Sequence, residues 1–151
     1  MFRAAVVTFF VSMIPVLELR GAIPMGVARG LPPLAAMAIA IAGNLVPVPF
    51  LILFTRRVFR WLKTKEWVRV PVERLEARAA DKSALVKKYE GIGLCILVAI
   101  PLPGTGAWTG ALVAAMMDLR LRYAMPAIGA GVAIAGLIIT VLTYGMKHLL
   151  G

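Results

Sequence analysis

The chain has few of the side chains on which enzyme active sites depend. Its 151 residues include one cysteine, Cys95, and one histidine, and its only serines are Ser12 and Ser83. A single cysteine cannot form an intrachain disulfide, and the sequence contains no HExxH, no GxSxG and no clustered metal ligands. The sequence therefore predicts no enzymatic activity, no metal site and no cofactor.

Acidic residues are scarce, and most of the chain has little charge of either sign. Asp and Glu total 7 against 17 Lys and Arg, giving a net charge of +10, while 61% of the residues are hydrophobic and the mean hydropathy is +0.89. Soluble chains are nearer half apolar, with about a quarter of their residues charged. The composition indicates a multi-pass membrane protein with a single domain, residues 1–151. A membrane surface explains the positive charge, so we expect no nucleic-acid partner.

Four apolar regions have about the length needed to cross a bilayer, at residues 4–29, 33–55, 91–117 and 123–147. The polar segment at about 56–90, between the second and third regions, contains most of the lysines and arginines. The positive-inside rule places this loop in the cytoplasm, beside the inner or plasma membrane. Aromatic residues alternate with the basic ones, which predicts a basic amphipathic helical loop at the membrane surface.

The second and fourth regions are typical of ordinary spanning helices, whereas the other two are interrupted at their centres. The interruptions are IPVLELRGAIP at residues 14–24 and IPLPGTGAWTG at residues 100–110. Irregular backbone at membrane depth is stable only where protein or a water-filled cavity surrounds it. Because one clean helix follows each interrupted segment, we divide the chain into two repeats, at about 1–55 and 91–151.

The two interrupted segments also share a spacing. Ile14-Pro15 corresponds to Ile100-Pro101, and the small residues Ala22, Gly26 and Gly30 are spaced like Gly106, Gly110 and Ala114. This alignment predicts that the first interruption is the longer one, with Glu18 and Arg20 in the added length.

Two topologies fit the interrupted segments. If they are re-entrant hairpins, the two halves have opposite orientations, as in many secondary transporters; if they span fully, the halves point the same way. The short link from Asp118 to Arg122, which includes Arg120, is cytoplasmic only in the re-entrant arrangement, and its arginines favour that arrangement. We therefore predict an all-α membrane fold, an inverted repeat of re-entrant hairpin plus transmembrane helix.

Glu18 and Arg20 are the clearest candidates for function, because ionisable residues inside a membrane segment are rare and costly. At i and i+2 they would not face each other on a regular helix, but the flanking prolines allow other geometries. One hypothesis is that Arg20 binds an anionic head group while Glu18 takes up and releases a coupling proton. The alternative is a structural ion pair that fixes the hairpin.

The second interruption has no charged side chains, and its candidate binding groups are backbone N–H groups. Its residues Pro101, Pro103, Gly104, Thr105 and Gly106 lead into a helix whose first N–H groups have no intrahelical partner. Such a helix start attracts anions. The alternative is that the glycines serve only close helix packing. Weaker substrate-binding candidates are Trp108 and Asn44, and Arg120 and Arg122 either contact a head group or set the topology.

ELRGAIP in the first interrupted segment and PLPGTGAW in the second resemble the small multi-drug export protein family. The resemblance covers essentially the whole chain, including the basic loop, and the family is a compact relative of the DedA and SNARE-associated (VTT) membrane proteins. It implies two re-entrant hairpins that meet in the membrane, often in a homodimer. By similarity, Glu18 and Arg20 match the acidic and basic positions of the first hairpin, and Pro101, Pro103, Gly104 and Gly106 match the second.

The wider superfamily includes flippases for undecaprenyl phosphate, driven by the proton-motive force, and lipid scramblases. Compared with the larger DedA proteins, this chain has no acidic residue in the second hairpin tip and fewer spanning helices. The superfamily thus implies lipid transport, whereas these two departures separate the chain from the proteins specific for lipid carriers.

Taken with the charges, these features predict a proton-coupled secondary transporter or flippase for an anionic amphiphile such as a lipid-linked (polyprenyl) phosphate. Its partners would be membrane lipids, a proton or other coupling ion, and further copies of the chain in a homodimer or higher homo-oligomer. Two alternatives stay open. One is a small-cation multidrug exporter that uses Glu18 for proton exchange, although Arg20 would repel its cargo. The other is a non-transporting membrane scaffold or assembly factor.

Overall fold

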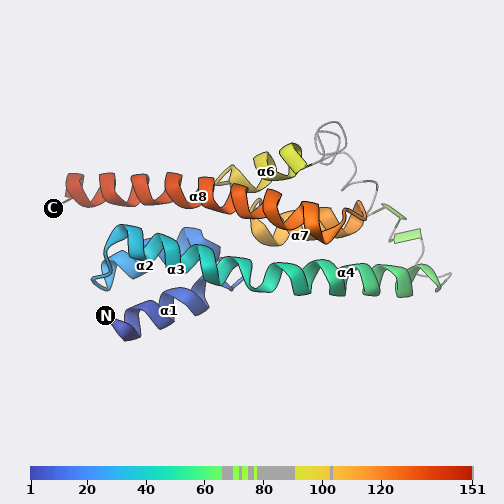
Figure 1. Ribbon diagram of the computed structural model, residues 1–151, viewed down its shortest axis with the longest axis horizontal. Coiled ribbons are helices and arrows are strands. Elements are labelled where there is room, and N and C mark those ends of the chain that lie inside the picture. Colours follow the sequence, from blue (N-terminus) through green and yellow to red (C-terminus); the bar gives the residue numbers. More distant parts are fainter. Residues whose placement is uncertain (66–69, 72, 75–76, 78–90, 103, 151) are drawn as a thin grey trace.

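The computed structural model describes residues 1–65, 70–71, 73–74, 77, 91–102 and 104–150. Their helices are α1 (Phe2–Ser12), α2 (Glu18–Ala28), α3 (Pro33–Leu45), α4 (Pro47–Lys63), α6 (Gly91–Ala99), α7 (Ala107–Met116) and α8 (Leu121–Leu150) (Figure 1). Most of the predicted basic loop, and Pro103 of the second interruption, lie outside the described residues.

Two helical stretches are long and apolar enough to cross a membrane. They are Pro33–Lys63, with 31 residues, and Leu121–Met146, with 26 residues, and both have a mean hydropathy of 2.2 over their most apolar part. A bilayer core needs only about 20 helical residues. The two helices that we predicted to span the membrane are therefore present as candidate spans, and the first consists of α3 and α4 in succession.

The junction of α3 and α4 follows from proline chemistry. Pro47 has no N–H to donate to the carbonyl of Gly43, so the helical hydrogen-bond ladder is interrupted and the helix breaks at Val46. Beyond this point α4 continues without a break to Lys63. The first residues of the predicted basic loop, from Arg56 on, are thus the end of the long helix and not part of a separate surface helix.

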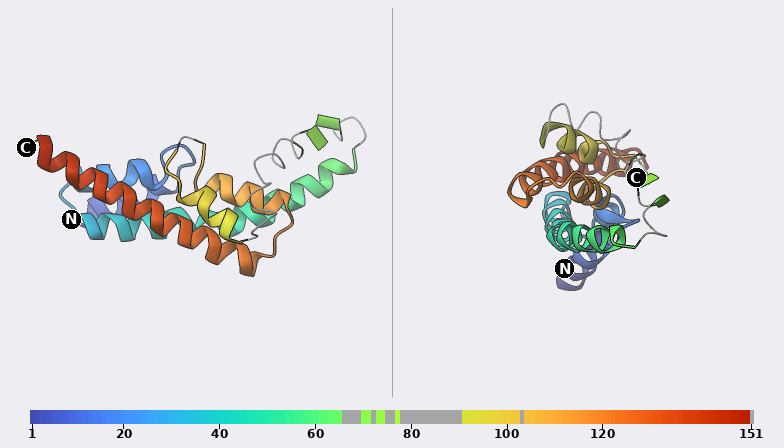
Figure 2. Two further views of the ribbon diagram at one scale, coloured as in Figure 1. Left: turned by 90° about the horizontal axis from the view of Figure 1, so that it is seen from above. Right: turned by 90° about the vertical axis from the view of Figure 1, so that its right-hand side faces the viewer.

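The other helices form two hairpins that approach each other from opposite ends of the molecule (Figure 1). Helix α1 runs from the end that holds the N-terminus to the middle of the long axis, and α2 returns to that end. Helix α6 runs to the middle from the other end, and α7 returns there. The two hairpin turns lie side by side near the middle in both lengthwise views (Figure 2).

The second helices of the two hairpins end in the same capping geometry. After α2, Gly30 has a φ of +87° and the Leu31 N–H donates to the Gly26 carbonyl at 3.0 Å. After α7, Asp118 has a φ of +55° and the Leu119 N–H donates to the Ala114 carbonyl at 3.0 Å. Each is a Schellman motif, in which a left-handed residue turns the chain out of the helix.

These caps correct the predicted alignment of the two halves. Gly30 corresponds to Asp118 and Gly26 to Ala114, one helical turn away from the pairing expected from the spacing of small residues. The following helices agree with this register, because α3 begins three residues after Gly30 and α8 begins three residues after Asp118. Gly30 therefore serves as a helix cap and not as part of a packing stripe.

The lengths of the two turns were also predicted wrongly. The first turn comprises residues 13–17, between α1 and α2, and the second comprises residues 100–106, between α6 and α7. The longer turn thus belongs to the second hairpin. Glu18 and Arg20 lie in the first turn of helix α2, where Glu18 has left-handed backbone with a φ of +47°, and Pro24 is accommodated inside the same helix.

Close approach of helices depends on glycine at two places. A Cβ on Gly131 of α8 would lie 2.7 Å from the carbonyl oxygen of Cys95 in α6. A Cβ on Gly43 of α3 would overlap the hydroxyl of Ser12 and the carbonyl oxygen of Phe9 in α1. Small residues at helix contacts are typical of membrane proteins, where dispersion contacts and not water exclusion stabilise helix pairs.

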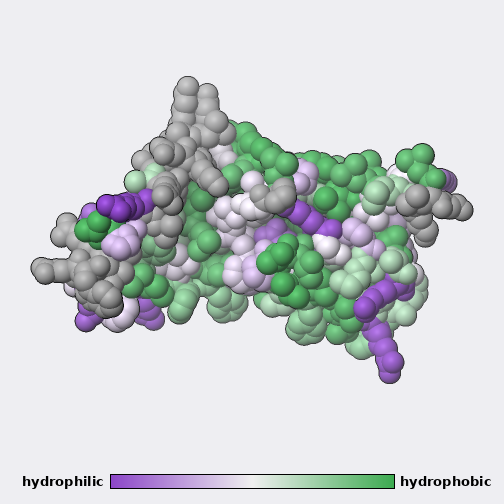
Figure 3. All heavy atoms as spheres, turned by 180° about the vertical axis from the view of Figure 1, so that it is seen from behind, coloured by the Kyte–Doolittle hydropathy of each residue, from purple (hydrophilic) through white to green (hydrophobic). Residues whose placement is uncertain are grey.

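The surface has the composition of a membrane protein. In Figure 3, hydrophobic residues cover much of the face shown, and hydrophilic residues gather near its ends and in a small patch near the middle. Exposed large apolar side chains occur along the molecule, for example Phe2, Phe10, Leu34, Phe50 and Leu142. A soluble monomer rarely exposes contiguous apolar surface on this scale.

Candidate functional site

Glu18 is the first residue of α2, and its side chain reaches the other hairpin. The residue is only 4% exposed. Its Oε1 accepts the backbone N–H of Trp108, in the first turn of α7, at 3.4 Å. The first N–H groups of a helix have no intrahelical partner and form its positive end. The Glu18 carboxylate therefore lies at the start of α7, where we predicted an anion site, and binding of a substrate anion there stays a prediction.

Gly106, immediately before α7, makes this contact possible. A Cβ built on Gly106 would overlap the carboxylate of Glu18. Its φ of +132° and ψ of −168° also lie in a region that is essentially restricted to glycine. Both the backbone conformation and the approach of the carboxylate therefore require glycine here.

Arg20 also binds the opposite hairpin, through its guanidinium group. Nη1 donates to the carbonyl oxygen of Leu102. Nη2 contacts the carbonyl oxygens of Thr105 at 2.7 Å and Ile100 at 3.3 Å, and the Thr105 hydroxyl at 2.9 Å. The guanidinium is thus bound mainly by backbone carbonyls of the second turn.

The two charges match the helix ends that they contact. Ile100 directly follows α6, so the Arg20 guanidinium lies at the negative C-terminal end of that helix, whereas Glu18 lies at the positive N-terminal end of α7. Among the described residues, no ion pair within 4.0 Å joins Glu18 to Arg20. In place of the local ion pair that was the alternative hypothesis, the structure shows two contacts between hairpins.

Thr105 organises the second turn. Its hydroxyl lies 2.6 Å from the Ile100 carbonyl oxygen and 2.7 Å from that of Leu102, and it accepts the Leu102 N–H at 3.2 Å. Gly104, with a φ of +80°, allows the chain to reverse beside it. The turn between Pro101 and Gly106 therefore directs several carbonyl oxygens toward Arg20.

Asn44, near the end of α3, is fully buried beside these contacts. It lines a small void together with Glu18, Arg20 and Gly106, and the void has no room for a water molecule. Neither polar atom of its side chain has a hydrogen-bond partner among the described residues. Asn44, a weaker substrate-binding candidate in the sequence, thus lies next to Glu18 and Arg20 but makes no hydrogen bond to the described residues.

The candidate arginines at the start of α8 lie apart from the turns. Arg120 and Arg122 are exposed, and the Arg122 guanidinium lies 4.8 Å from the centre of the Tyr123 ring. The structure therefore does not bring them to Glu18 or Arg20, and their predicted role at a head group or in topology stays a prediction.

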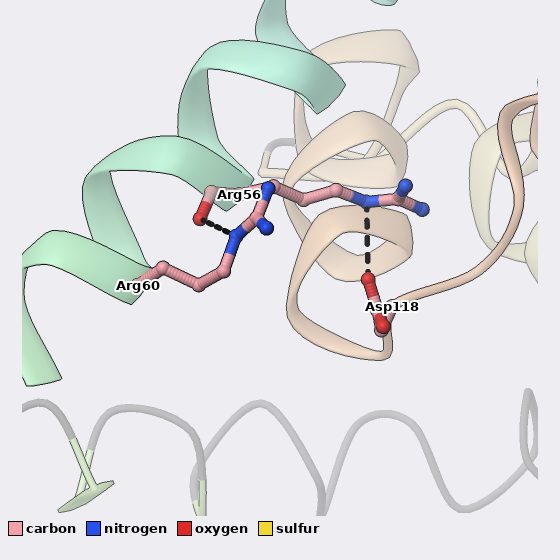
Figure 4. A network of polar contacts seen from close by, with 3 residues as sticks. All are labelled: Arg56, Arg60 and Asp118. Atoms are coloured by element: carbon pink, nitrogen blue, oxygen red, sulfur yellow. Dashed lines mark hydrogen bonds and ion pairs between the residues drawn. The ribbon is translucent and has the colours of Figure 1, made fainter.

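An ion pair that the sequence did not reveal joins α4 to the end of α7 (Figure 4). Nε of Arg56 lies 3.5 Å from Oδ1 of Asp118, and Arg60 contacts the Arg56 carbonyl at 3.4 Å. The ion pair brings the basic end of the long helix together with the α7–α8 link. Its residues are far apart in the chain and share no motif, so only their opposite charges hinted at the contact.

A comparison with known families gives one match. The family model described as "Putative small multi-drug export protein" matches residues 18–138, which include Glu18, Arg20, the second turn and most of α8. No curated protein and no solved structure matches the chain.

Proposed function

Because the chain belongs to the small multi-drug export protein family, we propose that it is a secondary membrane transporter whose substrate site lies where the two hairpin turns meet. Its substrate is an anionic amphiphile, such as a lipid-linked (polyprenyl) phosphate, and a proton is the coupling ion. The observation that carries the proposal is the Glu18 carboxylate at the start of α7, the place where a substrate anion would bind.

Competition between two anions provides the coupling. An unprotonated Glu18 occupies the N–H groups at the start of α7, and its charge repels a second anion. Protonation removes that charge, so a phosphate or carboxylate of the substrate can take its place on α7. Binding of the proton and binding of the anion then favour each other, and by linkage the effect is reciprocal.

Arg20 gives the substrate a second contact. In the observed state its donors are bound to carbonyl oxygens of the second turn. Hydrogen bonds to charged groups contribute about 1.5–3 kcal/mol each, so the turns separate only if a new acceptor replaces those carbonyls. A phosphate oxygen can do so, because it accepts from the guanidinium fork more strongly than a neutral carbonyl does.

The burial of Asn44 supports a substrate site where the two hairpin turns meet. Burying an amide without hydrogen bonds costs about 1–3 kcal/mol, and the described residues offer its side chain no partner. A cost of this size next to Glu18 and Arg20 is understandable if the amide gains its partners when a substrate separates the turns.

We also propose that both hairpins are re-entrant and that the two halves form an inverted repeat. Helices α1 and α2 have 11 residues each, α6 has 9 and α7 has 10. At 1.5 Å per residue these helices reach about half of a hydrocarbon core of about 30 Å. Turns at mid-depth, on hairpins from opposite sides, are typical of secondary-transporter binding sites.

The charge distribution supports one orientation of this repeat. Arg56 at the basic end of α4 pairs with Asp118, so the α7–α8 link lies at the same end of the molecule as α4. Under the positive-inside rule, this end, with Arg120 and Arg122, faces the cytoplasm.

Reconstituted liposomes with a pH gradient test the substrate class. We expect the protein to move a fluorescent polyprenyl phosphate, and Arg20→Ala to abolish this movement. Arg29→Ala is the matched control, because it removes the same charge from an exposed position just after α2, away from the turns, and it should leave the flux unchanged. Movement of a cationic dye alone, lost in Glu18→Gln, would instead support the small-cation exporter, and no movement of either would favour a scaffold.

A further inference from the structure

A hydrophobic groove lies on α4 beside α7. Its volume is about 700 Å³. Its walls are apolar side chains of α4 and the ring of Trp108 from α7, and two arginines complete the lining: Pro47, Phe50, Leu53, Phe54, Trp108, Arg57 and Arg60. Phe50 is 70% exposed and Phe54 68% exposed, so the described residues leave this face largely uncovered.

The order of residues along α4 gives the groove two chemically different ends. Phe50, Phe54 and Arg57 follow one another at spacings of four and three residues, which places them on one face of the helix. From Pro47 to Arg57 the helix rises about 15 Å, close to the thickness of one leaflet of a hydrocarbon core of about 30 Å. The groove is therefore apolar over roughly one leaflet and cationic at the level where head groups begin.

We infer that this groove binds an anionic phospholipid, with an acyl chain along Phe50 and Phe54 and its phosphate on Arg57 and Arg60. The two arginines supply charge-assisted hydrogen bonds for phosphate oxygens, and the phenylalanines and Trp108 supply the apolar wall. The groove shares Trp108 with the contact between Glu18 and α7, but it uses the indole ring and not the backbone N–H. The inference does not depend on the transport reaction.

A lipid fits the groove better than a second copy of the chain does. Two copies with the same membrane orientation, facing each other through this groove, would hold identical residues at identical depth. Arg57 and Arg60 of both copies would then approach each other and repel. An anionic lipid neutralises the same arginines.

Fluorescence of Trp108 provides a direct probe of this groove. With Trp61→Phe and Trp67→Phe, Trp108 is the remaining tryptophan of the chain. The protein is reconstituted in phosphatidylcholine vesicles that contain either brominated phosphatidylglycerol or brominated phosphatidylcholine at equal mole fraction, and bromine quenches nearby indole rings. We expect a relative binding constant roughly 5- to 30-fold higher for phosphatidylglycerol, from two basic residues near the head group.

Charge removal inside and outside the groove completes the test. Arg57→Gln with Arg60→Gln should lower the preference for phosphatidylglycerol to about that for phosphatidylcholine. Arg120→Gln with Arg122→Gln removes the same charge from residues that do not line the groove, and should keep the preference. Equal quenching by both lipids in the protein that retains all four arginines would overturn the inference. An equal loss of the preference for phosphatidylglycerol in the Arg120→Gln, Arg122→Gln control would also overturn it. So would a Phe50→Cys variant that cross-links to a second copy of the chain and is then quenched by neither lipid. Because the readout is binding, its failure leaves the transport proposal untouched.

Discussion

At the scale of single residues, Glu18 and Arg20 stabilise a contact between segments that are distant in the chain. Sequence position alone identified both as unusual, and it identified the start of α7 as an anion site. It could not show that Glu18 fills that site, because the partners are 90 residues apart for Glu18 and 80 to 85 for Arg20. Contacts between one side chain and a remote backbone leave no periodic pattern in a sequence, so only the fold reveals them.

Substitutions at Gly104 and Gly106 distinguish the cost of backbone strain from the cost of crowding against Glu18. Both have positive φ, but a Cβ on Gly104 would meet nothing within 4 Å, whereas a Cβ on Gly106 would overlap Glu18. We expect Gly104→Ala to lower the free energy of unfolding by about 1–3 kcal/mol through strain alone. Gly106→Ala should cost about 1–3 kcal/mol more through overpacking, as measured by unfolding in detergent.

Removal of the Glu18 side chain tests the origin of that difference. In a Gly106→Ala background, Glu18→Ala should recover the part of the loss that comes from crowding and leave the part that comes from φ. Equal effects of the two glycine substitutions, or no recovery in the double variant, would show that Glu18 does not lie against Gly106.

At the scale of helices, the sequence predicted the spanning helices and both interruptions, because each depends on local properties. Apolar length gives the spans, and Ile-Pro marks the place just after α1 and just after α6. The register of the repeat was wrong because one pattern of small residues serves two purposes. Gly26 lies in a helix contact, where a Cβ would be 2.7 Å from the Thr8 hydroxyl, whereas Gly30 forms a cap. Spacing alone cannot tell these apart.

The contact between α6 and α8 allows a test with two glycines of one helix. A Cβ on Gly131 would lie 2.7 Å from the Cys95 carbonyl oxygen, which cannot move without moving α6, and a Cβ on Gly129 would meet nothing within 4 Å. We expect Gly131→Ala to destabilise the protein by about 1–3 kcal/mol. Gly129→Ala should be neutral or stabilising by up to about 1 kcal/mol, since alanine favours the helix.

Thermal unfolding of both variants in the same detergent gives the comparison. Similar midpoints for Gly131→Ala and Gly129→Ala would mean that α6 and α8 do not approach as closely as described.

At the scale of the whole molecule, the two halves face opposite ends and meet in the middle (Figure 1). The family match and the two apolar helices support a membrane transporter, and the link to the larger DedA proteins stays a prediction. The concentration of arginines and lysines from Arg56 on predicts an orientation, and that orientation stays a prediction. The contact between the two turns was predicted only through the resemblance to the small multi-drug export protein family.

Cysteine accessibility tests this arrangement in cells, with Cys95→Ser as background. Lys65, just after α4, and Arg120, before α8, are exposed at one end, and Arg29, after α2, is exposed at the other. Single cysteines at 65 and 120 should therefore react with an impermeant maleimide from the same side of the membrane, and a cysteine at 29 from the opposite side. Labelling of 65 and 120 from different sides would contradict re-entrant hairpins.

The proton-gradient dependence of lipid flux tests the proposed competition at Glu18. Glutamine at position 18 keeps an oxygen that can accept the Trp108 N–H but cannot bind or release a proton. In proteoliposomes, flux of a fluorescent polyprenyl phosphate through the unaltered protein should rise with the imposed gradient. The flux through the Glu18→Gln variant should persist, because glutamine keeps the side chain at position 18 uncharged. This flux should not respond to the gradient. The same gradient dependence in both proteins would contradict the role of Glu18 as the coupling residue.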